Sequence, residues 1–297
     1  MMFWKQVTAF ALLRVASAFV SRTNVAFHQI STNLKLSSIL ESPPAAPVDQ
    51  VVVLEDANAV GEEIRSIVVN AAKKAIDERG FFALAIPGGS ILKMLVGDDI
   101  VGDWTTKTTI AYVNHKCVNM SDGDLATHAK AMKLFLNKWK GCNTLILDGT
   151  DQGAAEAEAY ERKLKALSED VLPRDSSGLP VFDLALIGVG DDGHIGSLYP
   201  GREEALVGAE GPWVLPVALK DPPSITLSLP VMANAKQVVV AACGVSDKYP
   251  QGKSAGMRRA IVAEGETLTS FPAVGLRKSA TWVMDKAAAS KLGDEYK

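Results

Sequence analysis

The sequence predicts an α/β fold with a doubly wound, mostly parallel sheet flanked by helices. Two observations support this fold class. Short apolar runs rich in Val, Ile and Ala recur from residue 51 onward, and stretches with apolar side chains at helical spacing separate them. Strands that alternate with helices pair in parallel, because each crossover helix returns the chain to the same edge of the sheet. The order of the elements therefore predicts a Rossmann-like domain.

The first two strands are expected over residues 51–54 and 81–86, on either side of a helix. The apolar positions of that helix recur every three or four residues: Val60, Ile64, Ile67, Val68 and Ala72. Further strands are expected over 108–113, 144–147, 181–187 and 237–242. Further helices are expected over residues 124–138, 153–168, 252–263 and 285–291.

The composition limits the classes of ligand. The chain has 297 residues, 47% of them hydrophobic, enough for one large core or two smaller ones. A net charge of −3 argues against a nucleic-acid partner, so an anionic ligand would be held by local cations and main-chain amides. Cys117, Cys142 and Cys243 form no C-x-x-C pair, so we expect a reducing compartment, no disulfide framework and no metal.

The N-terminal segment is typical of a targeting signal rather than of folded structure. We expect a presequence and linker over residues 1–46 and the catalytic domain over 47–297. The apolar run 7–13 precedes Ala16-Ser17-Ala18, which offers the small residues of a signal-peptidase site. The run is too short to cross a bilayer, so the mature form is expected without membrane attachment.

The junction Ala16-Ser17-Ala18-Phe19 resembles the bipartite presequences of algae with secondary plastids, in which an aromatic residue follows the first cleavage site. Residues 21–38 contain Ser, Thr and Asn and no acidic side chain, as transit peptides do. Plastid import is therefore expected, with a cytoplasmic or mitochondrial location as the alternative.

The segment 182–201 is the most informative part of the chain. An apolar strand runs into Gly188-Val189-Gly190-Asp191-Asp192-Gly193-His194. Ligands of open α/β sheets bind beyond the carboxyl ends of the strands, and imidazole is the usual acid or base at neutral pH. His194 is therefore the candidate catalytic residue; the alternative is a glycine-rich turn with an incidental histidine.

The segment Gly88-Gly89-Ser90 follows a second strand and precedes an expected helix. Main-chain amides and a helix N-terminus can bind a phosphate, with the Ser90 hydroxyl as a further donor. A tight turn that needs glycine would have the same sequence.

Four segments together resemble the 6-phosphogluconolactonase family, which is related to the glucosamine-6-phosphate deaminases. They are residues 83–90, 182–201, 223–230 with Asn234-Ala235 behind it, and 271–288, in the order of the family. The resemblance covers about residues 50 to 292, and it implies that family's α/β fold and a sugar-phosphate substrate.

The resemblance also implies roles for individual residues. His194 would activate a water molecule for attack on 6-phospho-D-glucono-1,5-lactone, with Asp192 as the residue that orients the imidazole. Lys253, in a Gly-Lys segment, would bind the phosphate together with Gly88, Gly89 and Ser90, although Lys248 could substitute. Arg277 matches a basic position of the family and is a further candidate to bind the phosphate; a surface charge is the alternative. No cofactor is expected, and the only expected partner is a small-molecule lactone.

The chain departs from the family at Asn114-His115-Lys116, where the family has Asp-Glu-Arg. A Ser-Asn pair downstream is also replaced, by residues near 125–128. Lys116 retains a positive charge for phosphate but lacks the bidentate fork of arginine. His115 leaves open a second acid or base beside the pocket.

Two other functions are considered. Aminosugar-phosphate isomerases or deaminases carry an aromatic residue followed by Asn-Glu-Pro after the Gly-His pair, whereas this chain has Gly196-Ser197-Leu198-Tyr199-Pro200-Gly201. A non-catalytic sugar-phosphate-binding protein is the second alternative, and residues 1–50 contain no helix-turn-helix of the kind that sensors of this class carry.

Overall fold

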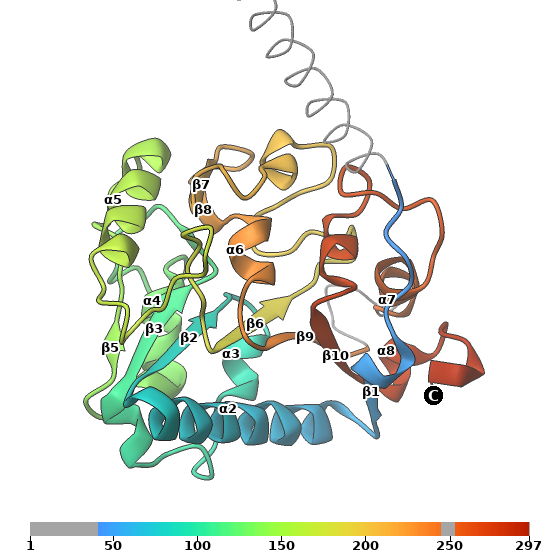
Figure 1. The fold of residues 1–297 in the computed structure, drawn as a ribbon, viewed down its shortest axis with the longest axis horizontal. Helices are drawn as coiled ribbons and strands as arrows, with labels where there is room; N and C mark the ends of the chain where they lie inside the picture. Colours follow the sequence, from blue (N-terminus) through green and yellow to red (C-terminus); the bar gives the residue numbers. More distant parts are fainter. Residues whose placement is uncertain (1–40, 245–252, 297) are drawn as a thin grey trace, which may run out of the picture. The chain divides into compact units, whose positions relative to one another are not determined.

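The computed structural model describes residues 41–244 and 253–296 (Figure 1), so the expected presequence lies almost entirely outside the described residues. Their centre is a seven-stranded sheet in which all neighbouring strands are parallel. In spatial order the strands are β1 (Val51–Leu54), β10 (Ala280–Asp285), β9 (Val238–Ala242), β6 (Leu184–Gly188), β2 (Phe82–Ile86), β3 (Thr108–Tyr112) and β5 (Asn143–Thr144). The predicted fold class is confirmed.

Burial explains the composition of the central strands. Every residue of β2, β3 and β9 is buried, which is why these segments are almost continuous runs of apolar residues. The expected helix after β1 is α2 (Ala57–Arg79), which packs against β1, β2 and β10. The Asp56 carboxylate caps it by accepting hydrogen bonds from the amides of Asn58 and Ala59, and it ends at Gly80, whose φ is 86°.

The helices expected over residues 124–138, 153–168, 252–263 and 285–291 are present but shorter than expected, and the helix over residues 229–233 was not expected. The helices after α2 are α3 (Ile91–Met94), α4 (Thr127–Ala131), α5 (Gly153–Lys165), α6 (Leu229–Ala233), α7 (Ser254–Ile261) and α8 (Lys286–Ala289). The helix expected from residue 124 begins three residues later, because the Asp122 carboxylate accepts the amides of Asp124 and Leu125 and holds that segment in a turn. It continues beyond α4 as a π-helical turn over Met132–Leu136.

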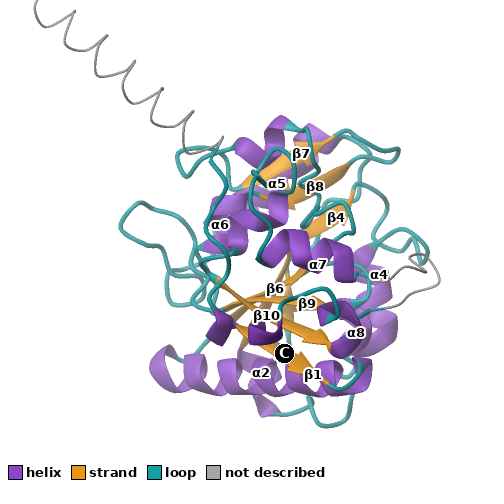
Figure 2. Cartoon of the chain, turned by 90° about the vertical axis from the view of Figure 1, so that its right-hand side faces the viewer, coloured by secondary structure: helices purple, strands orange, loops and turns teal. Residues whose placement is uncertain are grey.

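A second, antiparallel sheet was not expected from the sequence. It contains β4 (Asn114–Lys116), β8 (Ser224–Leu227) and β7 (Val214–Val217), and it lies in the upper part of Figure 2. Strands of three or four residues are too short to show an alternating pattern. Only Val113 separates β3 from β4, so the chain passes directly from the large sheet into the small one.

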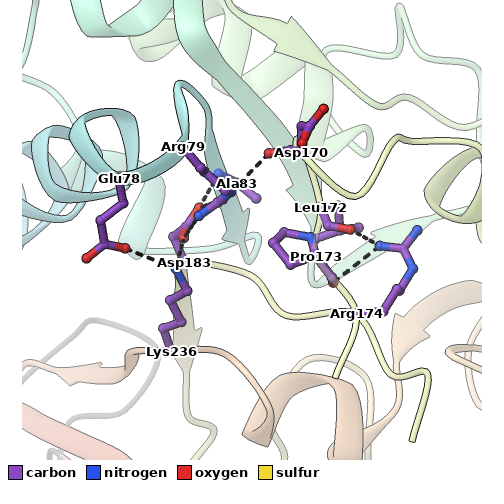
Figure 3. Close-up of polar contacts among 9 residues, drawn as sticks. All are labelled: Glu78, Arg79, Ala83, Asp170, Leu172, Pro173, Arg174, Asp183 and Lys236. Atoms are coloured by element: carbon purple, nitrogen blue, oxygen red, sulfur yellow. Dashed lines mark hydrogen bonds and ion pairs between the residues drawn. The ribbon is translucent and has the colours of Figure 1, made fainter. Parts of the chain in front are cut away.

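An ion cluster around the buried Asp183 carboxylate connects the segments that precede the central strands (Figure 3). The Asp183 carboxylate, 3% exposed, accepts hydrogen bonds from both terminal nitrogens of Arg79 and from the amide of Ala83 at 2.8 Å. Lys236 Nζ lies 3.3 Å from Asp183 Oδ1 and 3.3 Å from Glu78 Oε2. This cluster lies before β2, β6 and β9, at the edge of the sheet where these strands begin.

The folded unit begins at Ser42, earlier than the expected boundary at residue 47. Ala46 is 2% exposed, and its amide donates to the carbonyl of Ile261 at 2.9 Å. The carbonyl of Ala46 also accepts the Tyr296 hydroxyl at 3.0 Å. The last residues of the expected linker are therefore part of the domain.

The connections after β2 and β6 leave these neighbouring strands in opposite directions. From β2 the chain continues to β3, and from β6 it continues to β9 on the other side. Such a switch point is where open α/β sheets bind ligands, beyond the carboxyl ends of the strands. The fold therefore brings the segments after β2, β3, β6 and β9 to one edge.

Candidate active site

His194 lies in a tight loop that begins where β6 ends. The Gly190 amide donates to the His194 carbonyl at 2.8 Å, and the Gly193 amide donates to the Gly190 carbonyl at 3.0 Å. Gly193 has a φ of 84°, which favours glycine. A Cβ atom at Gly190 would lie 2.1 Å from His194 Nδ1, so only glycine leaves room for the imidazole there.

The Asp192 carboxylate contacts the His194 ring. Its Oδ1 lies 2.6 Å from His194 Nδ1 and also accepts the His194 amide at 3.1 Å. Partial burial opposes ionisation of Asp192, but its hydrogen bonds and charge interaction with His194 outweigh that effect and lower the pKa of the carboxyl group. With Nδ1–H directed at the carboxylate, Nε2 is the ring atom left to take a proton, and no described residue hydrogen-bonds to it.

The segment Gly88-Gly89-Ser90 forms the expected turn at the end of β2. Gly89 has a φ of 84°, and Ser90 precedes α3. Gly89 and Ser90 are exposed, whereas Gly88 is half-buried against Thr127, since a Cβ at Gly88 would lie 3.1 Å from Thr127 Oγ1. The exposed half of the turn is thus the part open to a ligand.

Asn114 connects this turn to the histidine loop. Its Oδ1 accepts the Gly88 amide at 3.4 Å, and its Nδ2 donates to Ser197 Oγ at 3.3 Å. Ser197 is 2% exposed, and its amide donates to Thr226 Oγ1 on β8 at 3.1 Å. Ser197 therefore supports the loop.

His115 points to the opposite side of β4 and is 1% exposed. Nδ1–H donates to the Lys116 carbonyl at 2.6 Å, and Nε2 accepts the His128 amide at 3.0 Å in the first turn of α4. Burial is the main cause that lowers the pKa of His115 to about 4. Both nitrogens are thus engaged within the fold, and the possibility of a second acid or base at His115 is not supported.

Lys116 lies on the same face of β4 as Asn114, because side chains two residues apart on a strand point the same way. Lys116 is half-buried and pairs with Ser224 of β8 in the sheet. Among the described residues it takes part in no ion pair. Its position suits a cation at the rim of the site.

Lys253 reaches the same edge from the start of α7. Its Nζ donates to the Val189 carbonyl at 2.5 Å, directly after β6, and its amide donates to the Gly244 carbonyl at 2.8 Å. The first turn of α7 is close to the histidine loop, since a Cβ at Gly256 would lie 3.3 Å from the Asp191 carbonyl. The alternative Lys248 lies outside the described residues.

Arg277 has a different role from the one expected. It is 1% exposed, and its guanidinium donates to four main-chain carbonyls. These belong to Ala260 and Arg259 in α7, Ala263 beyond its end, and Pro43, at 2.6 to 2.8 Å. The guanidinium caps the C-terminus of α7 and holds the N-terminal segment around Pro43 in place. The expected phosphate-binding role is therefore corrected, and Arg277 is left out of the phosphate site.

Sequence reasoning missed the parts of the site that depend on the small sheet. Tyr199 stacks on His194 with ring centroids 4.7 Å apart and an interplanar angle of 32°. Lys220, between β7 and β8, has its Nζ 4.7 Å from the Tyr199 centroid and 3.2 Å from the Tyr199 hydroxyl. An aromatic residue five positions after a histidine carries no periodic signal, so only the fold shows this contact.

The described residues contain no helix long and apolar enough to cross a membrane and no group of three or more His, Cys, Asp or Glu side chains arranged to hold a metal ion. The groups that converge here are an oriented imidazole, an exposed glycine turn and cations. This arrangement can activate water and bind an anion.

The chain is similar to known proteins over most of its folded part. Among curated relatives, a probable 6-phosphogluconolactonase 2 from Arabidopsis thaliana is 31% identical over 81% of this chain and 94% of its own. A chloroplastic 6-phosphogluconolactonase 3 from the same plant is 29% identical over 77% and 71%. The solved 6-phosphogluconolactonase of Leishmania guyanensis shares the fold with a TM-score of 0.66, at 22% identity over 84% of this chain and 99% of that one.

The family model described as glucosamine-6-phosphate isomerases/6-phosphogluconolactonase matches residues 55–283. That range contains β2, β6 and β9 together with His194, Asn114 and Lys253. The chain therefore belongs to the glucosamine-6-phosphate isomerase/6-phosphogluconolactonase family.

Proposed function

We propose that this protein hydrolyses 6-phospho-D-glucono-1,5-lactone to 6-phosphogluconate, the reaction of the oxidative pentose phosphate pathway, with His194 as the general base. The observation that carries the proposal is the 2.6 Å contact between Asp192 Oδ1 and His194 Nδ1 in a loop beside the Gly88 turn. The names of the relatives, which are 6-phosphogluconolactonases, support the same substrate.

In this reaction His194 Nε2 takes a proton from water while the water oxygen bonds to the lactone carbonyl carbon. The negative charge moves to the carbonyl oxygen. When the carbonyl re-forms, the bond from that carbon to the ring oxygen breaks, and the imidazolium returns the proton to the ring oxygen. Asp192 stabilises the imidazolium between the two steps and keeps the ring in the tautomer that presents Nε2.

The distal phosphate would be bound by the exposed amides of Gly89 and Ser90, with Lys253 and Lys116 as cations. Gly88 contributes less as a donor, because its amide is directed at Asn114. The phosphate contacts lie away from the carbonyl, so they hold the substrate equally in the ground and transition states and orient it for attack.

The test is lactone hydrolysis by the purified full-length protein, measured above the spontaneous rate. His194→Ala should lower kcat by about 10² to 10⁴, the usual worth of a general base, with little change in KM. Asp192→Asn serves as a graded control and should lower kcat less. A His194→Ala protein with the kcat of the wild type would refute the role of His194.

The two rival functions are separated by the same preparations. A deaminase or isomerase would release ammonia or a ketose from glucosamine 6-phosphate, and we expect neither, because residues 196–201 lack the Asn-Glu-Pro segment of those enzymes. A non-catalytic binding protein would bind 6-phosphogluconate without accelerating lactone hydrolysis.

A plastid location is part of the proposal. Chloroplastic relatives from Arabidopsis thaliana and rice support it, as does the junction Ala16-Ser17-Ala18-Phe19. A cytoplasmic or mitochondrial location is the alternative.

A further inference from the structure

Lys220 and His194 both contact the side chain of Tyr199. The centroid of the Tyr199 ring lies 4.7 Å from that of the imidazole, and Lys220 Nζ lies 4.7 Å from the phenol centroid and 3.2 Å from the phenol oxygen. Both side chains leave part of their surface exposed, so the ammonium is accessible from the same solvent as the imidazole.

The connection between β7 and β8, which contains Lys220, is fixed to the site where it enters β8. The Cys117 amide, directly after β4, donates to the Pro223 carbonyl at 2.8 Å. Thr226, three residues further on, accepts the amide of Ser197 in the histidine loop. The connection between β7 and β8 is thus anchored to the histidine loop.

The charge of Lys220 has no carboxylate partner among the ion pairs of the described residues, and the adjacent Asp221 forms none with it. Its contacts are with the π face and hydroxyl of Tyr199, which hold a cation without neutralising it. An unneutralised cation acts on its surroundings over several ångströms.

Other charged groups around His194 have different positions or partners. Asp192 is bonded to the imidazole, and Asp191 lies in the same loop. From α7, Arg259 is paired with Glu266 and stacked on Phe271, and Lys253 is bonded to the Val189 carbonyl. Lys220, from the connection between β7 and β8, contacts Tyr199 beside the imidazole.

We propose that Lys220, held by Tyr199, is a further residue of the catalytic site, where its ammonium group stabilises the negative charge that develops on the lactone carbonyl oxygen. This inference rests on the proposed function. It gives the small sheet a direct part in the chemistry, and it distinguishes Lys220 from the cations assigned to the phosphate.

The test compares lactone hydrolysis by the purified full-length protein and by its variants. The matched control Lys107→Gln removes an exposed lysine just before β3, at the opposite edge of the sheet, and should leave kcat unchanged.

Lys220→Gln should lower kcat about tenfold with a smaller change in KM, and Lys220→Arg should restore most of the rate. Tyr199→Phe, which keeps the ring but removes the hydroxyl, should lie between them. An unchanged kcat in Lys220→Gln, or an equal loss in Lys107→Gln, overturns the inference and leaves the proposed function standing. If the wild type itself does not hydrolyse the lactone, the proposed function fails and the inference fails with it.

Discussion

The imidazole of His115 caps the helix that contains His128. Its Nε2 accepts the His128 amide at 3.0 Å, an amide in the first turn of α4 that has no partner within the helix. Ala126, at the N-cap position, has no side chain to perform this task. A buried, neutral histidine from a neighbouring strand therefore replaces the usual local cap.

This cap predicts a loss of stability in mild acid. The folded state keeps His115 neutral down to a pKa of about 4, whereas the unfolded chain takes up a proton near pH 6.5. Between these values the unfolded state binds more protons, so stability is highest above pH 6.5 and falls as the pH decreases, by up to about 3 kcal/mol for this group. His128, whose pKa burial also lowers, acts in the same direction.

Urea unfolding at pH 7.5 and pH 5 measures this effect. His115→Gln, which can form similar hydrogen bonds but does not titrate, should be less stable than the wild type at pH 7.5 and lose less stability on acidification. Equal losses in the two proteins would contradict the assignment.

Lys253→Ala should raise KM for the phosphorylated lactone about tenfold or more and change kcat little, because a hydrogen bond to a charged group is worth about 1.5 to 3 kcal/mol. Lys253→Met is the control for packing, since it retains most of the aliphatic stem. With the dephosphorylated lactone as substrate, wild type and variants should have similar KM values. If the KM for the phosphorylated lactone is also similar in wild type and variants, Lys253 does not bind the phosphate.

Lys116→Ala should lower kcat/KM by a factor that corresponds to about 1 to 3 kcal/mol of lost transition-state stabilisation. Lys116→Arg should keep or improve kcat/KM. The reason is that Lys116 shares the site-facing side of β4 with Asn114 and contributes charge without a fixed geometry. Steady-state kinetics decide the point, and equal kcat/KM in Lys116→Ala and wild type would remove Lys116 from the site.

Asp183→Asn should destabilise the fold by about 3 kcal/mol, because it leaves the guanidinium of Arg79 partly buried without its carboxylate. Lys236→Gln is the matched comparison within the same cluster. Lys236 is 43% exposed, so its removal should cost less than about 1 kcal/mol. Urea unfolding at neutral pH measures both, and the prediction fails if the two variants are equally stable.

Residues 1–46 fused to a fluorescent protein should direct it to a complex plastid, and Phe19→Ala should divert it before it reaches the stroma. Fluorescence microscopy in an alga with secondary plastids is the measurement. Cytosolic fluorescence from the unaltered fusion would contradict the proposed location. Hydrolysis by the chain from Ser42 onward should equal that of the full chain, because Pro43 and Ala46 are still present to bond with Arg277 and Ile261.

The large sheet could be predicted because its strands are buried on both faces and leave continuous apolar runs. The turn at Gly88 and the loop of His194 could be predicted for a related reason, since they follow such strands directly. The contacts of Asn114, Tyr199 and Lys220 could not be predicted, because they depend on the short strands of the small sheet. Arg277 was misassigned because sequence shows a basic residue but not the four carbonyls that surround it.

The side chains of β4 alternate between the candidate site and α4, so neighbouring residues contribute to the site and to the stability of the fold. Asn114 serves the site and His115 serves α4, and only Val113 separates them from the large sheet. Deleting a single residue between β3 and β4 would exchange the two faces, placing an imidazole at the Gly88 turn and an amide under the helix. Length changes at this junction are therefore constrained more strongly than substitutions, and changes at 114 and 115 should show epistasis although their side chains never meet.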